Sequence, residues 1–118
     1  MAVKTSTMAP TGSMWLMGLK VTGSGGSFST AAITAAFDYA VTNGASVISM
    51  SFGGDFQDFG FMQALVDQAN AAGVVCVAAA GNSNNSVPLY PAALDGVIAI
   101  GATNNANQRA SFSSYGTW

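Results

Sequence analysis

The sequence predicts an α/β protein, a three-layer α/β/α arrangement with a mainly parallel, doubly wound sheet. Short apolar runs that end at Gly or Asn alternate with longer segments whose apolar residues recur at helical spacing. Strands that alternate with helices favour a parallel sheet with right-handed connections. The apolar run at residues 74–77 is continuous, as in a parallel strand covered on both faces. A chain of 118 residues, half of them hydrophobic, is enough for one domain at most.

The first half of the chain predicts one strand and one helix. Residues 15–21 are expected to form a strand, followed by a flexible loop over residues 22–27. The helix begins near Ser29 or Thr30, either of which can cap it, and stops at Asn43-Gly44. Its apolar stripe consists of Ile33, Ala36, Phe37, Ala40 and Val41.

The second half predicts two further crossovers. Strands are expected at residues 47–50 and 74–79, joined by a loop over residues 55–60 and a helix over residues 61–72. The remaining segments are a polar loop over residues 81–89, a rigid turn at Tyr90-Pro91, a strand over residues 97–100 and a short edge segment over residues 109–113.

Composition excludes several classes of function. Charged residues make up 7% of the chain, against about 25% in a typical soluble domain. The three cations are scattered and form no basic patch, so we expect no nucleic-acid partner. No run approaches the roughly 18 apolar residues of a membrane span, and the first residues lack the hydrophobic stretch of a signal peptide. The single Cys76 excludes an internal disulfide and is interpreted as a small hydrophobic side chain.

The segment VVCVAAAGN, residues 74–82, carries the clearest functional pattern. Its small residues remove side-chain bulk, so another group can approach the backbone closely. Asn82 then places a neutral amide at the carboxyl end of a central strand, where open α/β sheets bind ligands. Such an amide beside an exposed backbone is one way to build an oxyanion hole. The alternative is an Asn that merely favours a strand-to-loop turn.

Residues 78–82 (AAAGN) resemble the oxyanion-hole segment of the subtilisin-like serine proteases, the subtilases. Other matches keep the family's order and approximate spacing, and the chain is identified as similar to a central fragment of the catalytic domain. These matches lie at residues 8–10 (MAP), 18–21 (GLKV), 47–54 (VISMSFGG), 90–92 (YPA), 97–102 (VIAIGA) and 107–114 (NQRASFSS).

The resemblance implies a serine endopeptidase, but the residues for its chemistry are missing. A subtilase needs an aspartate on an early strand, a histidine opening a helix and a serine in a G-T-S-M-A setting. This chain has no His, and Ser113 and Ser114 lack that setting. Residues 1–118 are therefore expected to form a single partial subtilase-like domain that cannot assemble a Ser-His-Asp triad within one copy.

The resemblance also assigns site residues. Asn82 would donate to the oxyanion, and residues 51–54 would form a pocket wall that pairs with an extended substrate, although a strand followed by a glycine turn is the alternative. Residues 23–29 are either the opposite edge of the cleft or a surface loop, and the Tyr90-Pro91 bond is expected to be cis. The expected substrate-binding residues are Ser51, Phe52, Gly53, Gly54, Ala79, Ala80, Gly81, Gly26 and Ser27.

Partners and cofactors follow from the same resemblance. An extended peptide or protein is the expected substrate, and self-association is expected because few charges oppose it. No cofactor is expected, since Asp55 and Asp58 alone are too few ligands for a metal. The family suggests calcium and secretion, but no calcium site is identifiable in this chain.

Two other functions remain open. The chain can be a non-catalytic module that grips extended peptides through residues 51–54. It can also be a hydrolase with another mechanism, in which a Ser acts with Lys4 or Lys20.

Overall fold

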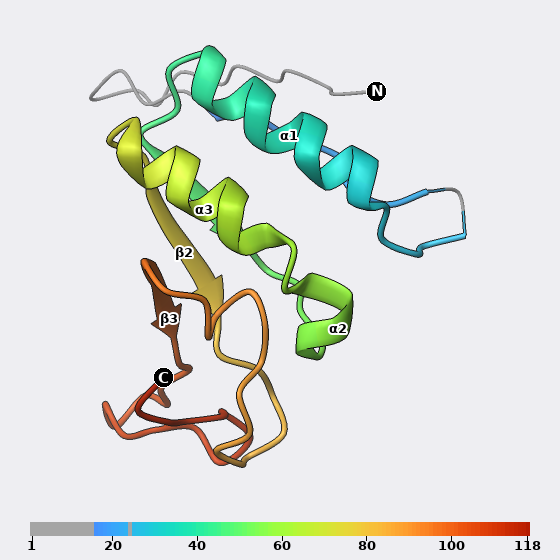
Figure 1. The fold of residues 1–118 in the computed structure, drawn as a ribbon. Coiled ribbons are helices and arrows are strands. Elements are labelled where there is room, and N and C mark those ends of the chain that lie inside the picture. Colours follow the sequence, from blue (N-terminus) through green and yellow to red (C-terminus); the bar gives the residue numbers. More distant parts are fainter. Residues whose placement is uncertain (1–15, 24) are drawn as a thin grey trace. The chain divides into compact units, whose positions relative to one another are not determined.

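The computed structural model describes residues 16–23 and 25–118. They fall into two units, Met1–Ala45 and Ser46–Trp118, and each unit is described by itself. Figure 1 shows the chain order of three helices and three strands in this described part. None of these helices is long and apolar enough to cross a bilayer.

The first unit contains helix α1, Thr30–Thr42. Ser29 is its N-cap, and the Ser29 hydroxyl accepts a hydrogen bond from the Ala32 N–H at 3.3 Å. The helix ends at Asn43, so both predicted boundaries are confirmed. Four members of the predicted apolar stripe are buried: Ile33, Ala36, Phe37 and Ala40.

The strand predicted over residues 15–21 is wrong where the structure describes it. Residues 16–21 carry no strand, and Trp15 lies outside the described residues. Within the described part of this segment, the pairing is an antiparallel bridge between Thr22 and Phe28. Its hydrogen bonds run from Gly23 N–H to the Ser27 carbonyl at 3.0 Å and from Ser29 N–H to the Val21 carbonyl at 3.3 Å. An apolar run does not become a strand unless a neighbouring strand satisfies its backbone groups.

The second unit is built on a three-stranded parallel sheet of order β1-β2-β3. Its strands are β1 Val47–Met50, β2 Val75–Ala79 and β3 Val97–Ile100. Ala78 pairs with Met50 on one side and with Ala99 on the other, so all three strands end at the same edge. The predicted α/β class and its parallel sheet are therefore confirmed.

Two helices connect β1 to β2. The loop predicted over residues 55–60 is wrong, because Phe56–Phe59 form the short helix α2. The Asp55 carboxylate accepts a hydrogen bond from the Asp58 N–H at 3.1 Å and so caps this turn. Helix α3, Met62–Ala71, lies within the predicted range and packs on β2.

The two faces of the sheet differ in exposure. Cys76 and Ala78 point to one face and are almost fully buried, as are the residues that α3 contributes, Met62, Val66 and Ala69. The strand register places exposed apolar side chains together on the opposite face, with Val75 43% and Ile98 52% exposed. The expectation that the second strand is covered on both faces is therefore not met within the described residues.

The end of the chain is mostly turns. The Tyr90-Pro91 bond is cis, as predicted. The edge segment expected over residues 109–113 is wrong. Only Arg109 pairs there among the described residues, in one bridge with Thr103, and a turn follows.

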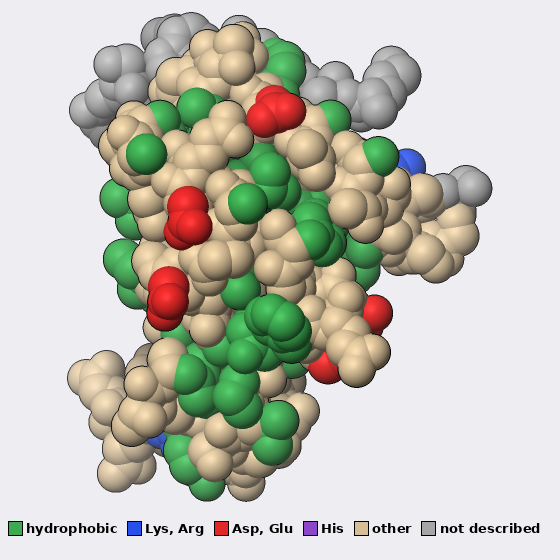
Figure 2. Space-filling model, viewed as in Figure 1, with side chains coloured by type: hydrophobic (Ala, Val, Ile, Leu, Met, Phe, Trp, Pro, Cys, Tyr) green, Lys and Arg blue, Asp and Glu red, His purple; other side chains and the backbone are tan. Residues whose placement is uncertain are grey.

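Lys and Arg side chains are isolated on the face drawn in Figure 2 and form no basic patch there.

Candidate functional site

A cavity of about 400 Å³ opens where β1 and β2 end. Residues that follow β1 form one wall, and residues at the end of β2 form the other, as expected for a ligand site at the carboxyl ends of parallel strands. We call this cavity the strand-end cleft. Its lining includes six of the predicted site residues: Ser51, Phe52, Gly53, Ala79, Gly81 and Asn82.

The β1 wall is fixed by the chain that returns before the cis-proline turn. Gly54 and Tyr90 exchange two backbone hydrogen bonds of 2.9 Å each. The Leu89 carbonyl accepts a further backbone hydrogen bond from the Ala93 N–H at 2.8 Å. Gly54 thus does not line the cleft itself, although it was predicted to contact the substrate. It instead anchors the segment that closes the cleft.

The β2 wall is fixed by the last residues of the chain. Ser114 N–H donates to the Gly81 carbonyl at 3.0 Å, and Ser83 N–H donates to the Ser114 hydroxyl at 3.2 Å. Asn84 N–H adds a 2.9 Å bond to the Phe112 carbonyl. The turn that carries Asn82 is therefore held on both sides.

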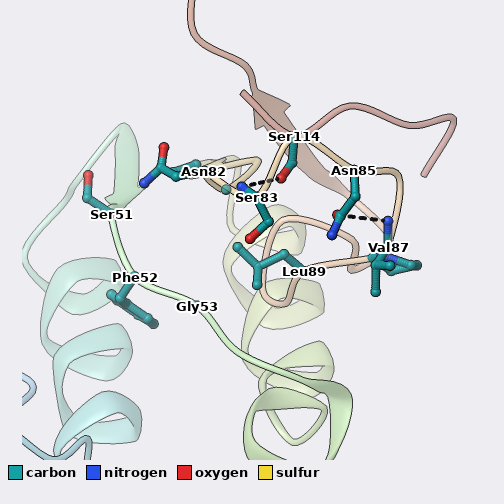
Figure 3. A pocket seen from close by; sticks show the side chains of 12 residues that line it. Ser51, Phe52, Gly53, Asn82, Ser83, Asn85, Val87, Leu89 and Ser114 are labelled. Atoms are coloured by element: carbon teal, nitrogen blue, oxygen red, sulfur yellow. Dashed lines mark hydrogen bonds between the residues drawn. The ribbon is translucent and has the colours of Figure 1, made fainter. Parts of the chain in front are cut away.

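The Asn82 side chain is an available hydrogen-bond donor. It is exposed and makes no hydrogen bond to any residue that the structure describes. Figure 3 shows its amide directed toward the side of the cleft on which Ser51 lies. Because its backbone is held and its amide is unpaired within the described chain, Asn82 can donate to a ligand without first breaking a bond.

Two glycines let the walls approach Leu89. A Cβ on Gly53 would lie 2.7 Å from the Tyr90 carbonyl oxygen and 3.0 Å from Leu89 Cδ2. A Cβ on Gly81 would also lie 3.0 Å from Leu89 Cδ2, and the Gly81 φ of +106° already disfavours any other residue. The group that approaches the backbone of these two glycines is therefore a side chain of the protein itself.

The strand-end cleft is electrically neutral. None of its lining residues is charged, and the remaining six are Ser83, Asn85, Val87, Pro88, Leu89 and Ser114. The thiol of Cys76 on β2 does not line the cleft, and burial raises its pKa. A nucleophilic thiolate is accordingly disfavoured at that position.

The two serines near the end of the chain serve structure. Ser113 is fully buried, and its hydroxyl donates to the Ser114 carbonyl at 3.0 Å and accepts from the Ala102 N–H at 2.9 Å. The Ser114 hydroxyl supports Ser83 as described. With no His in the chain, neither hydroxyl has an imidazole base.

Ala80 does not line the strand-end cleft. It lines a second cavity of about 340 Å³, in which the Arg109 guanidinium lies 4.5 Å from the centre of the Tyr115 ring. The same guanidinium donates to the Ser113 carbonyl at 2.6 Å and to Asn84 Oδ1 at 2.9 Å. The Arg109 guanidinium therefore stabilises the fold of this part of the chain.

The described residues contain no group of three or more His, Cys, Asp or Glu that could hold a metal ion.

Gly26 and Ser27 lie in the first unit, in the exposed loop between Thr22 and Phe28. Gly26 has a φ of +79°, which fits a tight turn. Their contact with a substrate stays a prediction.

Sequence reasoning missed half of the cleft lining. Leu89 directly precedes the Tyr90-Pro91 turn, which was itself predicted, so its position at the cleft could have been predicted as well. Ser114 carries no local signal, because it reaches the cleft only through hydrogen bonds to residues 81 and 83.

Known proteins with similar sequences define the class. The model of the Subtilase family matches residues 6–118. Subtilisin DY of Bacillus licheniformis is 47% identical over 105 residues, which cover 86% of this chain and 38% of that relative. Thermitase of Thermoactinomyces vulgaris is 39% identical over 102 residues, which cover 86% of this chain and 36% of that relative.

Solved structures agree with this assignment. The self-cleaved protease domain of PatA is similar with a TM-score of 0.68 and 31% identity, covering 76% of this chain and 35% of that structure. A lanthipeptide protease shares the fold with a TM-score of 0.72 at 23% identity, over 83% of this chain and 34% of that structure. The chain belongs to the subtilase family of serine proteases. It spans between a third and two fifths of the length of these relatives.

Proposed function

We propose that this chain forms the substrate-binding part of a subtilisin-like serine endopeptidase. The observation that carries the proposal is the strand-end cleft, where the segments after β1 and β2 meet around one neutral cavity. An extended peptide would pair with the backbone of residues 51–53, a form of β-augmentation, and place one side chain in the cleft.

Asn82 supplies the second part of the proposal. Its unpaired amide would donate a hydrogen bond to the oxyanion that develops when the peptide carbonyl is attacked. Removing one such donor typically costs about 10²–10³ in rate, a magnitude that comes from mutagenesis of subtilisin itself, a relative of this chain.

The bond-breaking chemistry requires groups beyond these 118 residues. A hydroxyl nucleophile needs an adjacent base, and the chain has no His. The proposed division of labour is therefore that this chain binds and orients the peptide and offers the oxyanion donor.

Peptide titration by NMR tests the proposal. We expect an extended, uncharged tetrapeptide to shift the amide signals of residues 51–54 and 80–82 in the complete chain. The matched control is the same peptide with methylated backbone nitrogens, which cannot form strand-like hydrogen bonds and should not bind. Shifts confined to residues 55–61, or equal binding of both peptides, would contradict the proposal.

We also propose that a second copy of the chain covers the exposed face of the sheet. The register places four exposed apolar residues on that face, Val47, Val75, Ile98 and Ile100. Large uncovered apolar patches seldom persist on monomers, and a net charge of −2 opposes association weakly.

A further inference from the structure

Helix α1 ends on Asn43, and the residue that follows is Gly44. No other asparagine in the sequence precedes a glycine. Both residues are exposed to solvent, and a Cβ on Gly44 would have no atom within 4 Å. The backbone nitrogen of Gly44 is therefore free of the side-chain bulk that would hinder its attack on the preceding amide carbon.

The reaction open to this pair is loss of the Asn43 side-chain amide. The Gly44 nitrogen gives up its proton and bonds to Asn43 Cγ, the Cγ–Nδ2 bond breaks, and Nδ2 leaves with that proton as ammonia. The product is a cyclic imide, a succinimide. Water then adds to one of the imide carbonyl carbons and opens the ring to an aspartate or to an isoaspartate, in which the main chain runs through Cβ and Cγ. Water is the only other reactant.

A hydrogen-bonded cap holds the attacking nitrogen in the folded chain. Gly44 N–H donates to the Val41 carbonyl at 3.2 Å, and Ala45 N–H donates to the Ala40 carbonyl at 2.9 Å. These are the two bonds of a Schellman motif, in which Gly44, with a φ of +74°, is the left-handed residue after the helix. The nitrogen becomes free to attack when this cap opens, and helix ends open locally without unfolding of the whole chain.

The reaction removes a hydrogen bond and adds a charge that nothing in the helix end offsets. The Asn43 amide nitrogen donates to the Tyr39 carbonyl at 2.8 Å, and a carboxylate has no proton to donate there. The new negative charge lies at the negative end of the helix dipole, and the last turn of α1 has no basic residue. An isoaspartate also lengthens the main chain at the point where the Schellman motif forms.

We infer that Asn43 is a site of spontaneous deamidation, that the Schellman cap of α1 controls its rate, and that conversion weakens the helix. The inference is independent of the proposed function, because it involves no residue of the strand-end cleft. Helix α1 contributes four buried side chains, Ile33, Ala36, Phe37 and Ala40. The opening of one helix end thereby limits the lifetime of the folded chain.

Peptide mapping by mass spectrometry measures the conversion. The complete chain is incubated in mildly alkaline buffer, with and without a denaturing concentration of urea, and the peptide that contains Asn43 is followed with time. We expect Asn43 to convert faster than any other asparagine in both samples. In urea its rate should be about tenfold higher or more, because the hydrogen bonds of the cap no longer oppose the attack. Conversion of Asn43 no faster than that of the other asparagines would overturn the site, and equal rates in the two samples would overturn its control by the cap.

The variant Asn43→Asp carries the charge of the product. In urea denaturation we expect its ratio of folded to unfolded chain to fall by about fivefold, from the lost hydrogen bond and the helix dipole. The matched control is Asn104→Asp, because Asn104 Oδ1 accepts from the Ala106 N–H at 2.9 Å and the Gln108 N–H at 3.0 Å, bonds that a carboxylate also accepts. Its ratio should stay within about twofold of the unchanged chain.

Equal ratios in Asn43→Asp and Asn104→Asp would overturn the weakening of the helix. If Asn43→Asp does not fold, circular dichroism of the unchanged chain, followed as Asn43 converts, decides the same point. Helical content that stays constant while Asn43 is converted would overturn the weakening, and a loss in step with conversion would support it.

Discussion

Replacing Gly81 with Ala tests how tightly the strand-end cleft is built. Two separate costs are expected from this one methyl group. The φ of +106° lies in a region that residues with a Cβ adopt at a cost of about 1–3 kcal/mol. The added Cβ would also meet Leu89 Cδ2 at 3.0 Å and the Ser114 hydroxyl oxygen at 3.1 Å, and overpacking of this kind costs about 1–3 kcal/mol. The sum predicts a loss of about 2–6 kcal/mol in the free energy of unfolding.

Gly73→Ala separates these two costs. Gly73 lies in the same unit with a φ of +80°, but a Cβ there would have no atom within 4 Å. In Gly73→Ala the free energy of unfolding should therefore fall only by the cost of the backbone conformation. The additional fall in Gly81→Ala measures the cost of the crowding. Urea denaturation of both variants gives the comparison, provided that the dependence on urea concentration is unchanged.

A double-mutant cycle with Leu89→Ala then assigns the crowding to its source. Removing the Leu89 methyl groups should make Gly81→Ala less costly by about 1 kcal/mol, because residues in contact couple by about 0.5–3 kcal/mol. The Ser114 contact would remain, so the relief should be partial. If Gly81→Ala costs no more than Gly73→Ala, or if the coupling is zero, Leu89 does not fill the space between the two walls.

Four further predictions concern the chemistry, the buried thiol and the association of the chain. The purified chain should neither digest casein nor react stoichiometrically with a fluorophosphonate, because it has no His base, and labelling of Ser113 or Ser114 would contradict this. The Cys76 thiol should react with a thiol reagent only after unfolding, since it is fully buried. Burial raises the pKa of this thiol, so the unfolded chain loses the proton first as the pH rises. The free energy of unfolding should then fall above about pH 8.5, relative to Cys76→Ala, by at most about 1.4 kcal/mol per pH unit. Ile98 lies on the exposed sheet face, so Ile98→Ser should lower the concentration-dependent mass measured by light scattering. The control Asp38→Ser, on α1, should leave that mass unchanged. An unchanged mass in Ile98→Ser would refute association through the sheet face.

The elements that the sequence predicted well are those specified by residues close in the chain. Helix α1 begins at Ser29 because a hydroxyl there reaches the Ala32 N–H, and its apolar stripe recurs at helical spacing. The strands β2 and β3 were placed within one residue, because their apolar runs are bounded by Gly or Asn. The cis bond before Pro91 followed from the family resemblance, since composition alone would have favoured trans.

The errors have equally specific causes. Residues 16–21 look like a strand, but whether they pair depends on a neighbour that their own sequence does not contain. The stretch around Asp55 looks like a loop because two acids and two Phe show no helical period, yet the Asp55 carboxylate caps a four-residue helix. A single turn of helix is too short for periodicity to reveal it.

The cleft shows where motif-level reasoning stops. The wall after β1 was predicted from the family resemblance, since its own residues fit a glycine turn equally well, whereas the wall after β2 was also predicted because parallel sheets bind ligands at the carboxyl ends of their strands. The small residues that end at Gly81 were interpreted as allowing another group to approach the backbone, and the structure places the Leu89 side chain there. A glycine in a sequence shows that something comes close to it, but not whether that group belongs to the substrate or to the protein.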